Sequence, residues 1–471
     1  MPPPKVHSRV RLLQPPLHVS EIDPEQVPAA LWTREFIARC QETTGSSSLT
    51  LTLARTDGTA ATFRTLVLPL GVDDFQNFLH VERTLKFLLW SRGGNQVKVA
   101  GVLADYFVGK LRETYRLGGA RSFDWEFHRK IFETPIVLDA VAESELPKPV
   151  SSALTLGRHL DGCRIGFDLG GSDRKCAALI DGQVVFSEEV KWDPYFQANP
   201  NYHLAGIRDS LNRAAAHLPR VDAIGGSSAG VYLHNKVRIA SLFRGVTDPK
   251  IFAEKVSRIF LDLAAEWKVP FEVLNDGDVT ALAASMSLGR NAVLGVAMGT
   301  SVAAGYVDSE GKLTHWLSEL AFVPVDYRDG GPRDEWSGDQ GCAVQYFSQQ
   351  AVGRLLPLAG IHLPATLPLP EKLEELQRLM AQGDPRAHKV YKTIGIALGY
   401  AVAHFASFYP ISALLIMGRV TTGTGGDLII AQAQGVLRDE FPELRIDLIV
   451  PNEKDKRHGQ AIAAASLPPI A

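Results

Sequence analysis

Three apolar segments of this chain each run directly into a polar turn that contains glycine. They are "RIGFDLGGS" at 164–172, "VLGVAMGTS" at 293–301 and "ISALLIMGRVTTGTGG" at 411–426. Glycine lets a chain turn tightly and tolerates positive φ, and the backbone N–H groups of such a turn can surround a phosphate. One glycine turn is ordinary at a strand end, but three in this order are hard to explain that way. The pattern favours an α/β protein whose strand ends bind phosphate.

The first turn also carries an acid. Asp168 lies near the end of the strand predicted for 164–169, just before Gly170, Gly171 and Ser172. Mg²⁺ prefers hard oxygen ligands and keeps much of its hydration, so we expect Asp168 to hold Mg²⁺ through water. The plain alternative is a hairpin with a glycine turn and an aspartate at its edge.

A fourth polar turn, "LNDGD" at 274–278, lies between a short strand and an alanine-rich helix. Asp276 can accept the proton of a substrate hydroxyl while the hydroxyl oxygen attacks the γ-phosphate of a nucleotide. Alternatively, Asn275 and Asp276 cap the helix that follows, a common role for both residue types. The two roles are compatible.

The order of predicted elements divides the 471 residues into units. Residues 1–30 are rich in proline and are expected to be irregular, 31–150 favour an α/β domain of unknown role, and 151–162 have linker composition. Beyond them, strands come first and then alternate with helices. A buried strand is predicted at 221–224, followed by a glycine-rich loop, and an amphipathic helix is predicted over 250–267.

Within the N-terminal unit, the pattern predicts a β-hairpin over 47–69 and a helix over 73–94 that ends at two glycines. A short strand over 95–101 and a second helix over 102–117 follow.

Charge and cysteine content exclude some classes of protein. The net charge of −3 gives no electrostatic case for binding nucleic acid or an acidic membrane, and no apolar stretch is long enough to span a bilayer. The four cysteines are scattered without a C-x-x-C, which indicates neither a disulfide framework nor a zinc site. The N-terminus lacks the apolar core of a signal peptide. We therefore expect a cytoplasmic protein that binds neither nucleic acid nor membrane.

In the order of its four turns, the chain from 163 onward resembles the ROK family of sugar kinases and repressors, within the actin-like ATPase (ribonuclease H-like) fold. The resemblance implies a first lobe over 163–275 and a second over 276–471, with the last helix returning to the first lobe. It also implies ATP and Mg²⁺ as cofactors, a sugar-like substrate and a homodimer. Residues 1–160 lie outside it and do not resemble the helix-turn-helix of the family's repressors.

Single residues match the family's functional motifs. Asp168 matches the Mg²⁺-associated acid and Asp276 the catalytic base. Asn275 matches a sugar-binding asparagine, Glu319 a glutamate that contacts sugar hydroxyls, and the glycines around Gly230 a loop near the sugar. The implied nucleotide- and phosphate-binding residues are Asp168, Gly170, Gly171, Ser172, Gly299, Thr300, Gly418 and Gly423.

The sequence also departs from the family pattern. Phe322 stands where the family has a histidine, and Val344 where a second glutamate is expected near the sugar. Only Cys342 remains of a zinc-binding cysteine cluster, so we expect no structural zinc. Five acids in the same region can recruit a different polar substrate, but we interpret the region as an acidic, solvated loop; they are Asp326, Asp329, Asp334, Glu335 and Asp339.

The leading hypothesis is an ATP-dependent kinase for a hydroxyl of a sugar or sugar-like molecule, with Asp276 as the base. The alternative is a sensor or regulator that binds a sugar or nucleotide without catalysis. Loss of the histidine and the cysteine cluster favours the sensor, whereas retention of Asp168 and Asp276 opposes it. A third hypothesis is an ATPase that drives a conformational change. A doubly wound dinucleotide-binding fold is disfavoured because no G-x-G-x-x-G follows a strand.

Overall fold

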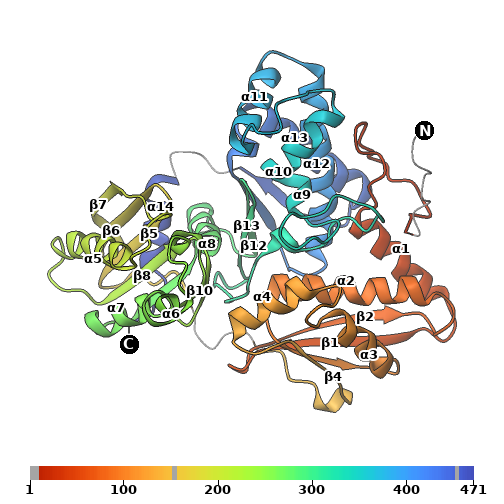
Figure 1. The fold of residues 1–471 in the computed structure, drawn as a ribbon, viewed down its shortest axis with the longest axis horizontal. Helices are drawn as coiled ribbons and strands as arrows, with labels where there is room; N and C mark the ends of the chain where they lie inside the picture. Colours follow the sequence, from red (N-terminus) through yellow and green to blue (C-terminus); the bar gives the residue numbers. More distant parts are fainter. Residues whose placement is uncertain (1–9, 151–155, 451–455, 471) are drawn as a thin grey trace.

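The computed structural model describes residues 10–150, 156–450 and 456–470. An N-terminal α/β domain (red to orange), a first lobe (yellow and green) and a second lobe (cyan and blue) lie around a common centre (Figure 1). The predictions made for 1–9 and 151–155 fall outside the described residues. None of the helices described is long and apolar enough to cross a membrane.

The N-terminal domain is built on a four-stranded sheet with the order β2-β1-β3-β4, in which only β3 and β4 are parallel. The hairpin, the two helices and the strand predicted from the sequence are confirmed, whereas α1, α4 and β4 are additions that the pattern does not predict. The elements are α1 (Ala29–Glu42), β1 (Ser47–Ala54), β2 (Ala60–Val67), α2 (Asp74–Arg92), β3 (Gln96–Ala100), α3 (Ala104–Thr114), α4 (Ser122–Phe132) and β4 (Val137–Ala140).

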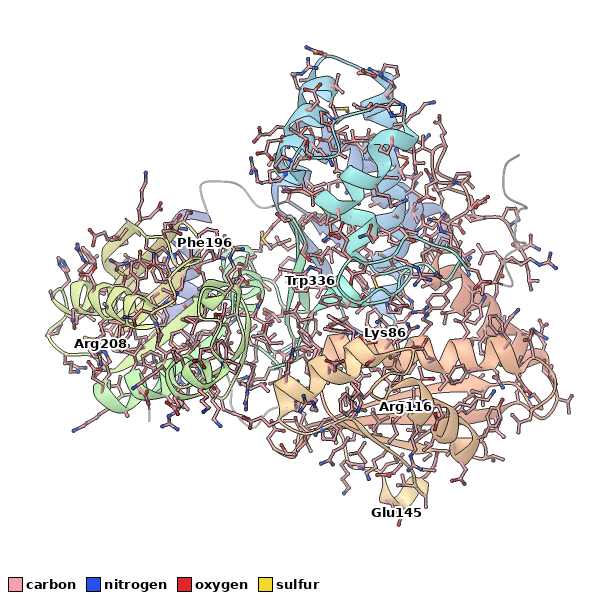
Figure 2. All side chains as sticks on the ribbon, viewed as in Figure 1. Lys86, Arg116, Glu145, Phe196, Arg208 and Trp336 are labelled. Atoms are coloured by element: carbon pink, nitrogen blue, oxygen red, sulfur yellow. The ribbon has the colours of Figure 1, made fainter. Side chains whose placement is uncertain are left out.

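Helix α2 joins the N-terminal domain to the second lobe. It begins where the Asp73 side chain accepts a hydrogen bond from the backbone N–H of Gln76, and it ends at Gly93, whose φ is 70°. Leu85 and its neighbours pack inside the domain, whereas Phe87 and Trp90 belong to the core of the second lobe. Lys86, on the same helix, is fully buried where the two bodies meet (Figure 2).

The first lobe has a five-stranded sheet with the order β11-β8-β5-β6-β7, in which β5, β8 and β11 are parallel. Its elements are β5 (Cys163–Leu169), β6 (Asp173–Ile180), β7 (Gln183–Lys191), α5 (Asn201–Ala215), β8 (Ala223–Ser228), β9 (Val231–Leu233), β10 (Lys236–Ile239), α6 (Pro249–Ile251), α7 (Ile259–Trp267) and β11 (Phe271–Asn275). The last helix, α14 (Lys456–Ala465), packs against β5, β6 and β8 and so returns to this lobe.

The glycines that follow the predicted strand at 221–224 are not in a loop, which corrects that expectation. Gly225 and Gly226 lie inside β8. A Cβ on Gly225 would stand 1.7 Å from the carbonyl oxygen of Ala464, and one on Gly166 would stand 1.7 Å from that of Ala461. These glycines therefore let the backbone of α14 lie directly on the sheet.

The helix predicted over 250–267 is interrupted. Asp248 caps α6 by accepting the N–H groups of Lys250 and Ile251. A π-helical turn over Phe252–Val256 separates α6 from α7. Helical periodicity alone does not distinguish such a turn from a continuous helix.

The second lobe has a sheet with the order β13-β12-β14-β15, in which only β13 is antiparallel to its neighbour. The elements are α8 (Asp276–Leu288), β12 (Val293–Met298), β13 (Val302–Val307), α9 (Val344–Phe347), α10 (Gln349–Leu358), α11 (Leu369–Ala381), α12 (Pro385–Ala406), β14 (Ala413–Met417), α13 (Gly423–Glu440) and β15 (Asp447–Ile449). Asn275 ends β11 and Asp276 begins α8, so the chain enters this lobe without an intervening residue.

Candidate functional site

The carboxyl ends of three parallel strands meet at one edge of the first lobe. Leu169 of β5 lies opposite Ser228 of β8, and Ser228 lies opposite Asn275 of β11. Asp168 is one residue before the end of β5, and Asp276 directly follows β11. The strand register thus places both acids at the same edge of the sheet.

Asp168 is bonded to one hydroxyl and lies near one amine. The Ser227 hydroxyl donates to Oδ1 of Asp168 at 2.6 Å, and Nζ of Lys175 lies 3.9 Å from Oδ2. Burial raises the pKa of Asp168, while Ser227 and Lys175 act in the opposite direction. The sequence alone does not assign Ser227 to the site; it enters because its strand lies beside β5 in this register.

Asp276 carries a shifted pKa. Burial, followed by the charge of Asp168, raises the pKa of Asp276 to about 6, while the N–H of Gly277, which donates to Oδ1 at 3.0 Å, opposes the shift. A carboxyl with this pKa is ionised at neutral pH and is still more basic than an ordinary aspartate. The strand register places Asp168 at the same edge of the sheet, where its charge can act on Asp276.

Asn275 uses both ends of its side-chain amide. Its Oδ1 accepts the N–H of Gly277 at 2.7 Å and so caps α8, which confirms the capping role. Its Nδ2 donates to the carbonyl of Gly230 at 2.7 Å. Asn275 therefore joins the start of α8 to Gly230, which lies between β8 and β9 with a φ of 138°.

The first glycine turn connects β5 to β6. The N–H of Gly170 donates to the carbonyl of Asp173 at 2.9 Å, and the Ser172 hydroxyl donates to the Asp173 carboxylate at 2.8 Å. Neither Gly170 nor Gly171 has a positive φ, so the expected conformational reason for these glycines is wrong. Gly171 is needed for space, because a Cβ there would lie 2.0 Å from the Tyr195 hydroxyl oxygen.

The second and third turns lie at one edge of the second lobe. β12 and β14 are parallel, with Ala297 opposite Met417, so Gly299 and Gly418 follow adjacent strand ends. Gly418 has a φ of 101°, and a Cβ there would lie 2.4 Å from the Met298 carbonyl oxygen.

The other predicted phosphate-binding residues of these two turns are Thr300, Gly299 and Gly423. The Thr300 side chain is exposed at the tip of the β12–β13 hairpin. The carbonyl of Gly299 accepts the N–H of Gln349 at 2.9 Å. Gly423, with a φ of 72°, begins α13.

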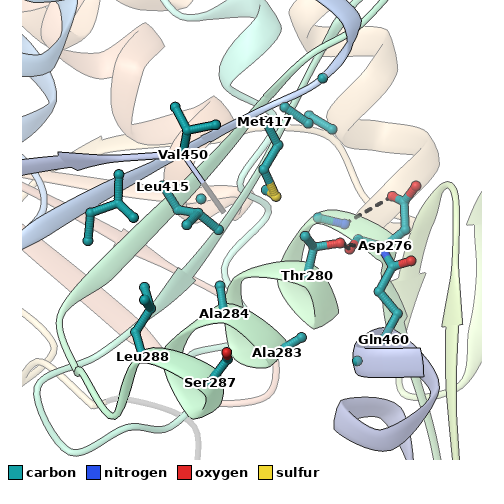
Figure 3. Close-up of a pocket in the computed structure, with 17 residues that line it drawn as sticks. Asp276, Thr280, Ala283, Ala284, Ser287, Leu288, Leu415, Met417, Val450 and Gln460 are labelled. Carbon is teal, nitrogen blue, oxygen red and sulfur yellow. Dashed lines mark hydrogen bonds between the residues drawn. The ribbon is translucent and has the colours of Figure 1, made fainter. Parts of the chain in front are cut away.

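A cavity of about 530 Å³ extends from Asp276 along α8 and the sheet of the second lobe (Figure 3). Thr280 and Gln460 lie beside Asp276, and Gln460 donates to the Thr280 hydroxyl. Apolar side chains, including Leu288 and Leu415, line the rest. Asp276 and Gly418 are the predicted site residues in its lining, whereas the other predicted residues lie outside it. Thr280 and Gln460 carry no sequence motif, and only the packing of α14 against α8 brings them together.

Glu319 is electrostatically coupled to the same acids. Burial, and then the charge of Asp276, raises the pKa of Glu319 to about 7. Burial also raises the pKa of Asp278 well above its usual range, with Glu319 and Asp276 contributing. Glu319 lies far from Asp276 in the sequence, yet the fold brings it within reach of the charge of Asp276.

The region after Glu319 is only partly the solvated acidic loop expected from the sequence, with Asp329 and Glu335 exposed. Asp326, Asp334 and Asp339 are 1%, 3% and 7% exposed, so that interpretation is wrong for these three residues. Burial raises the pKa of the Cys342 thiol to about 12. Among the described residues, no group of three or more His, Cys, Asp or Glu side chains is arranged to hold a metal ion.

Comparison with solved structures identifies the fold. A ROK hexokinase from Thermus thermophilus superposes with a TM-score of 0.52 at 19% sequence identity, over 64% of this chain and 96% of the hexokinase. The fold is therefore the two-lobed actin-like ATPase fold, as expected. The sequence profile of the ROK family matches residues 164–467, and the chain belongs to this family.

Two further ROK structures have lower TM-scores than this hexokinase. A ROK glucokinase from Streptomyces griseus, solved with glucose and AMPPNP, has a TM-score of 0.46 at 19% identity, over 64% of this chain and 98% of its own. A ROK transcriptional regulator homologous to E. coli MLC has a TM-score of 0.49 at 18% identity, over 65% of this chain and 79% of its own. No curated protein matches the chain.

Proposed function

We propose that this protein is an ATP-dependent phosphotransferase that acts on a hydroxyl of a sugar or sugar-like molecule. The observation that carries the proposal is the pair of acids at the strand ends, in which Asp168 helps to raise the pKa of Asp276 to about 6. A general base works best with a pKa near the operating pH, and a metal-associated acid beside it is what phosphoryl transfer requires.

In the proposed reaction, Asp276 accepts the proton of the substrate hydroxyl. The hydroxyl oxygen forms a bond to the γ-phosphorus, the bond from that phosphorus to the bridging oxygen breaks, and ADP leaves. Asn275, Gly230 and Glu319 would surround the sugar, with Glu319 accepting hydroxyl hydrogen bonds. Because the Asn275 amide is already bonded at both ends, its part is to fix the start of α8 beside Gly230.

Asp168 suits Mg²⁺ by its donor chemistry. Ser227 occupies Oδ1, and Oδ2, which lies 3.9 Å from the Lys175 ammonium, would be the hard oxygen for a hydrated cation. Mg²⁺ would supply charge neutralisation of the phosphates.

We assign nucleotide and phosphate binding to the three glycine turns. In the first lobe this is the turn with Gly170, Gly171 and Ser172. In the second lobe the residues are Gly299, Thr300, Gly418 and Gly423. The proposal includes a cytoplasmic homodimer that uses no zinc and binds neither nucleic acid nor membrane.

A sensor that binds sugar or nucleotide without catalysis is the second candidate. Phe322 favours it, because this aromatic side chain packs on Trp90, with the ring centroids 4.3 Å apart, and offers no polar group to a substrate. A panel of sugars and related hydroxyl compounds, assayed for ADP release with ATP and Mg²⁺, separates the candidates. Release with one compound supports the kinase, and binding without release supports the sensor.

A further inference from the structure

The carboxyl end of α2 is hydrogen-bonded to the segment 317–319, which contains Glu319. The N–H of Glu319 donates to the carbonyl of Trp90 at 3.0 Å, that of Ser318 to Ser91 at 3.0 Å, and that of Leu317 to Arg92 at 3.2 Å. The last four carbonyls of a helix have no partner within the helix. Three of them are satisfied here by three consecutive residues, the third of which is Glu319.

A second connection lies at Asp339, on the same region of the second lobe. Three cations of the N-terminal domain surround its carboxylate: Arg83 at 2.8 Å, Lys86 at 3.0 Å and Arg121 at 2.6 Å. Although burial acts in the opposite direction, these cations hold the pKa of Asp339 well below its usual range. The buried aspartate is therefore ionised and paired.

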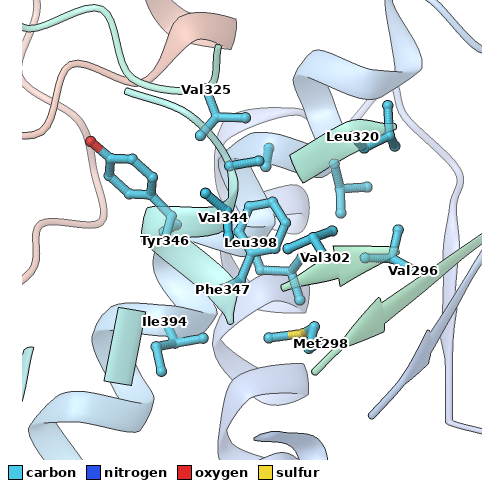
Figure 4. Packing of buried hydrophobic residues seen from close by; sticks show 14 of the residues in the cluster. Val296, Met298, Val302, Leu320, Val325, Val344, Tyr346, Phe347, Ile394 and Leu398 are labelled. Atoms are coloured by element: carbon cyan, nitrogen blue, oxygen red, sulfur yellow. The ribbon is translucent and has the colours of Figure 1, made fainter. Parts of the chain in front are cut away.

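A third connection is apolar. Phe322 packs against Trp90 of α2 and against Phe123 and Phe127 of α4, with ring centroids 4.3, 5.6 and 6.2 Å apart. On its other side, the region from Leu320 to Val325 joins the core of the second lobe (Figure 4). The region that begins at Glu319 is thus enclosed between the two bodies.

The residues of the N-terminal domain that make these three connections lie outside the family domain, which begins at residue 164. Glu319 and Asp339 lie inside it. We propose that the N-terminal domain positions Glu319 for substrate binding, with Arg83, Lys86 and Arg121 acting through Asp339 as positioning residues. The substrate part of this inference rests on the proposed function of Glu319. Removing one cation leaves buried charge uncompensated, so the Glu319 segment would loosen without any change at the phosphate-binding turns.

Hydrogen–deuterium exchange on the full chain tests the connection without any substrate. The test variant is Arg121→Met, because Arg121 is the cation of the three with the most exposed side chain, at 13%. Arg121→Lys keeps the charge and should restore protection. Arg116→Met is the matched control, since Arg116 pairs with the exposed Glu113 on the outer surface.

In Arg121→Met and in Asp339→Asn, we expect exchange of the amides of 317–319 to rise by about tenfold or more, as local opening becomes easier. Exchange at 297–301 should stay unchanged, as a check that the variants are folded. Unchanged protection of 317–319 in both folded variants would overturn the inference.

Kinetics on any substrate found then test the role in binding. We expect KM for that substrate to rise by about tenfold in Arg121→Met, with kcat and KM for ATP nearly unchanged, and Arg121→Lys to restore it. Loosened amides with an unchanged KM would overturn the positioning role. If no compound is phosphorylated, the proposed function fails, and the exchange result alone decides whether the N-terminal domain holds Glu319.

Discussion

Ser227 on β8 donates its hydroxyl to Asp168 on β5 across 2.6 Å, at the strand edge where the acids of the site meet. This bond is one of the two contacts that favour the ionised form of Asp168 against burial. The hydroxyl of a residue on the neighbouring strand therefore limits the rise that burial causes in the pKa of the acid that we assign to the metal.

Ser227→Ala should weaken binding of ATP–Mg²⁺ by about tenfold, because a hydrogen bond to a charged group is worth about 1.5–3 kcal/mol. The loss should be larger at pH 6 than at pH 8, since the pKa of Asp168 rises further. Isothermal titration at both pH values measures the affinity for ATP–Mg²⁺. Ser228→Ala is the control, because Ser228 bonds to Tyr232. Equal affinity in both variants would refute the role of this bond.

Asp276→Asn should lower turnover by about 10²–10⁴-fold, as is typical when a general base is removed. Binding of ATP–Mg²⁺ should stay nearly intact. Asp168→Asn, in contrast, should reduce both turnover and nucleotide binding. ADP release and titration on the two variants make the comparison. Wild-type turnover in Asp276→Asn would leave Asp276 as a structural residue and favour the sensor.

Glu272 provides a test of stability against pH away from the proposed chemistry. Burial raises its pKa from 4.5 to about 7, so the folded state binds a proton more tightly than the unfolded state. The contribution of the Glu272 carboxyl to the free energy of unfolding is fully present below pH 4.5 and is lost as the pH rises through 7. Glu272→Gln should therefore gain at most about 3 kcal/mol over wild type at pH 8 and nearly nothing at pH 4.5. Urea unfolding at the two pH values checks this, and an equal difference at both would contradict it.

Gly225→Ala should destabilise the protein by about 1–3 kcal/mol or more, the usual cost of overpacking. The added Cβ would stand 1.7 Å from the Ala464 carbonyl oxygen and would push α14 off the sheet. Gly109→Ala is the control, because Gly109 lies in α3 with nothing within 4 Å of its Cβ position; it should stabilise slightly. Thermal unfolding compares the two, and a neutral Gly225→Ala would contradict the packing.

Elemental analysis of the purified protein should find no zinc, and a chelator should leave Tm unchanged. Cys342 is buried beside Lys86, whose ammonium already pairs with Asp124 and Asp339. About one zinc per chain, lost only on unfolding, would contradict the prediction that the region around Cys342 holds no structural zinc.

The sequence predicts the part of the fold that local patterns determine. The glycine turns mark the strand ends, and the strand-to-helix turn at Asn275 correctly indicates the cap of α8. The contribution of the N-terminal domain is not predictable in this way. Glu319 and Trp90 are far apart in the chain and share no motif, and their contact joins backbone groups. From composition, Asp339 is expected to be exposed to solvent. Only the fold reveals the three cations that surround its carboxylate.

The junction of Asn275 and Asp276 has a mechanical consequence. Since the last residue of β11 is bonded directly to the first residue of α8, this peptide unit connects the two lobes with no residue between them. Any rotation of one lobe against the other turns the Asp276 carboxylate with it, because no spare residue absorbs the motion. A rotation of the second lobe against the first would therefore also change the direction of the proposed base.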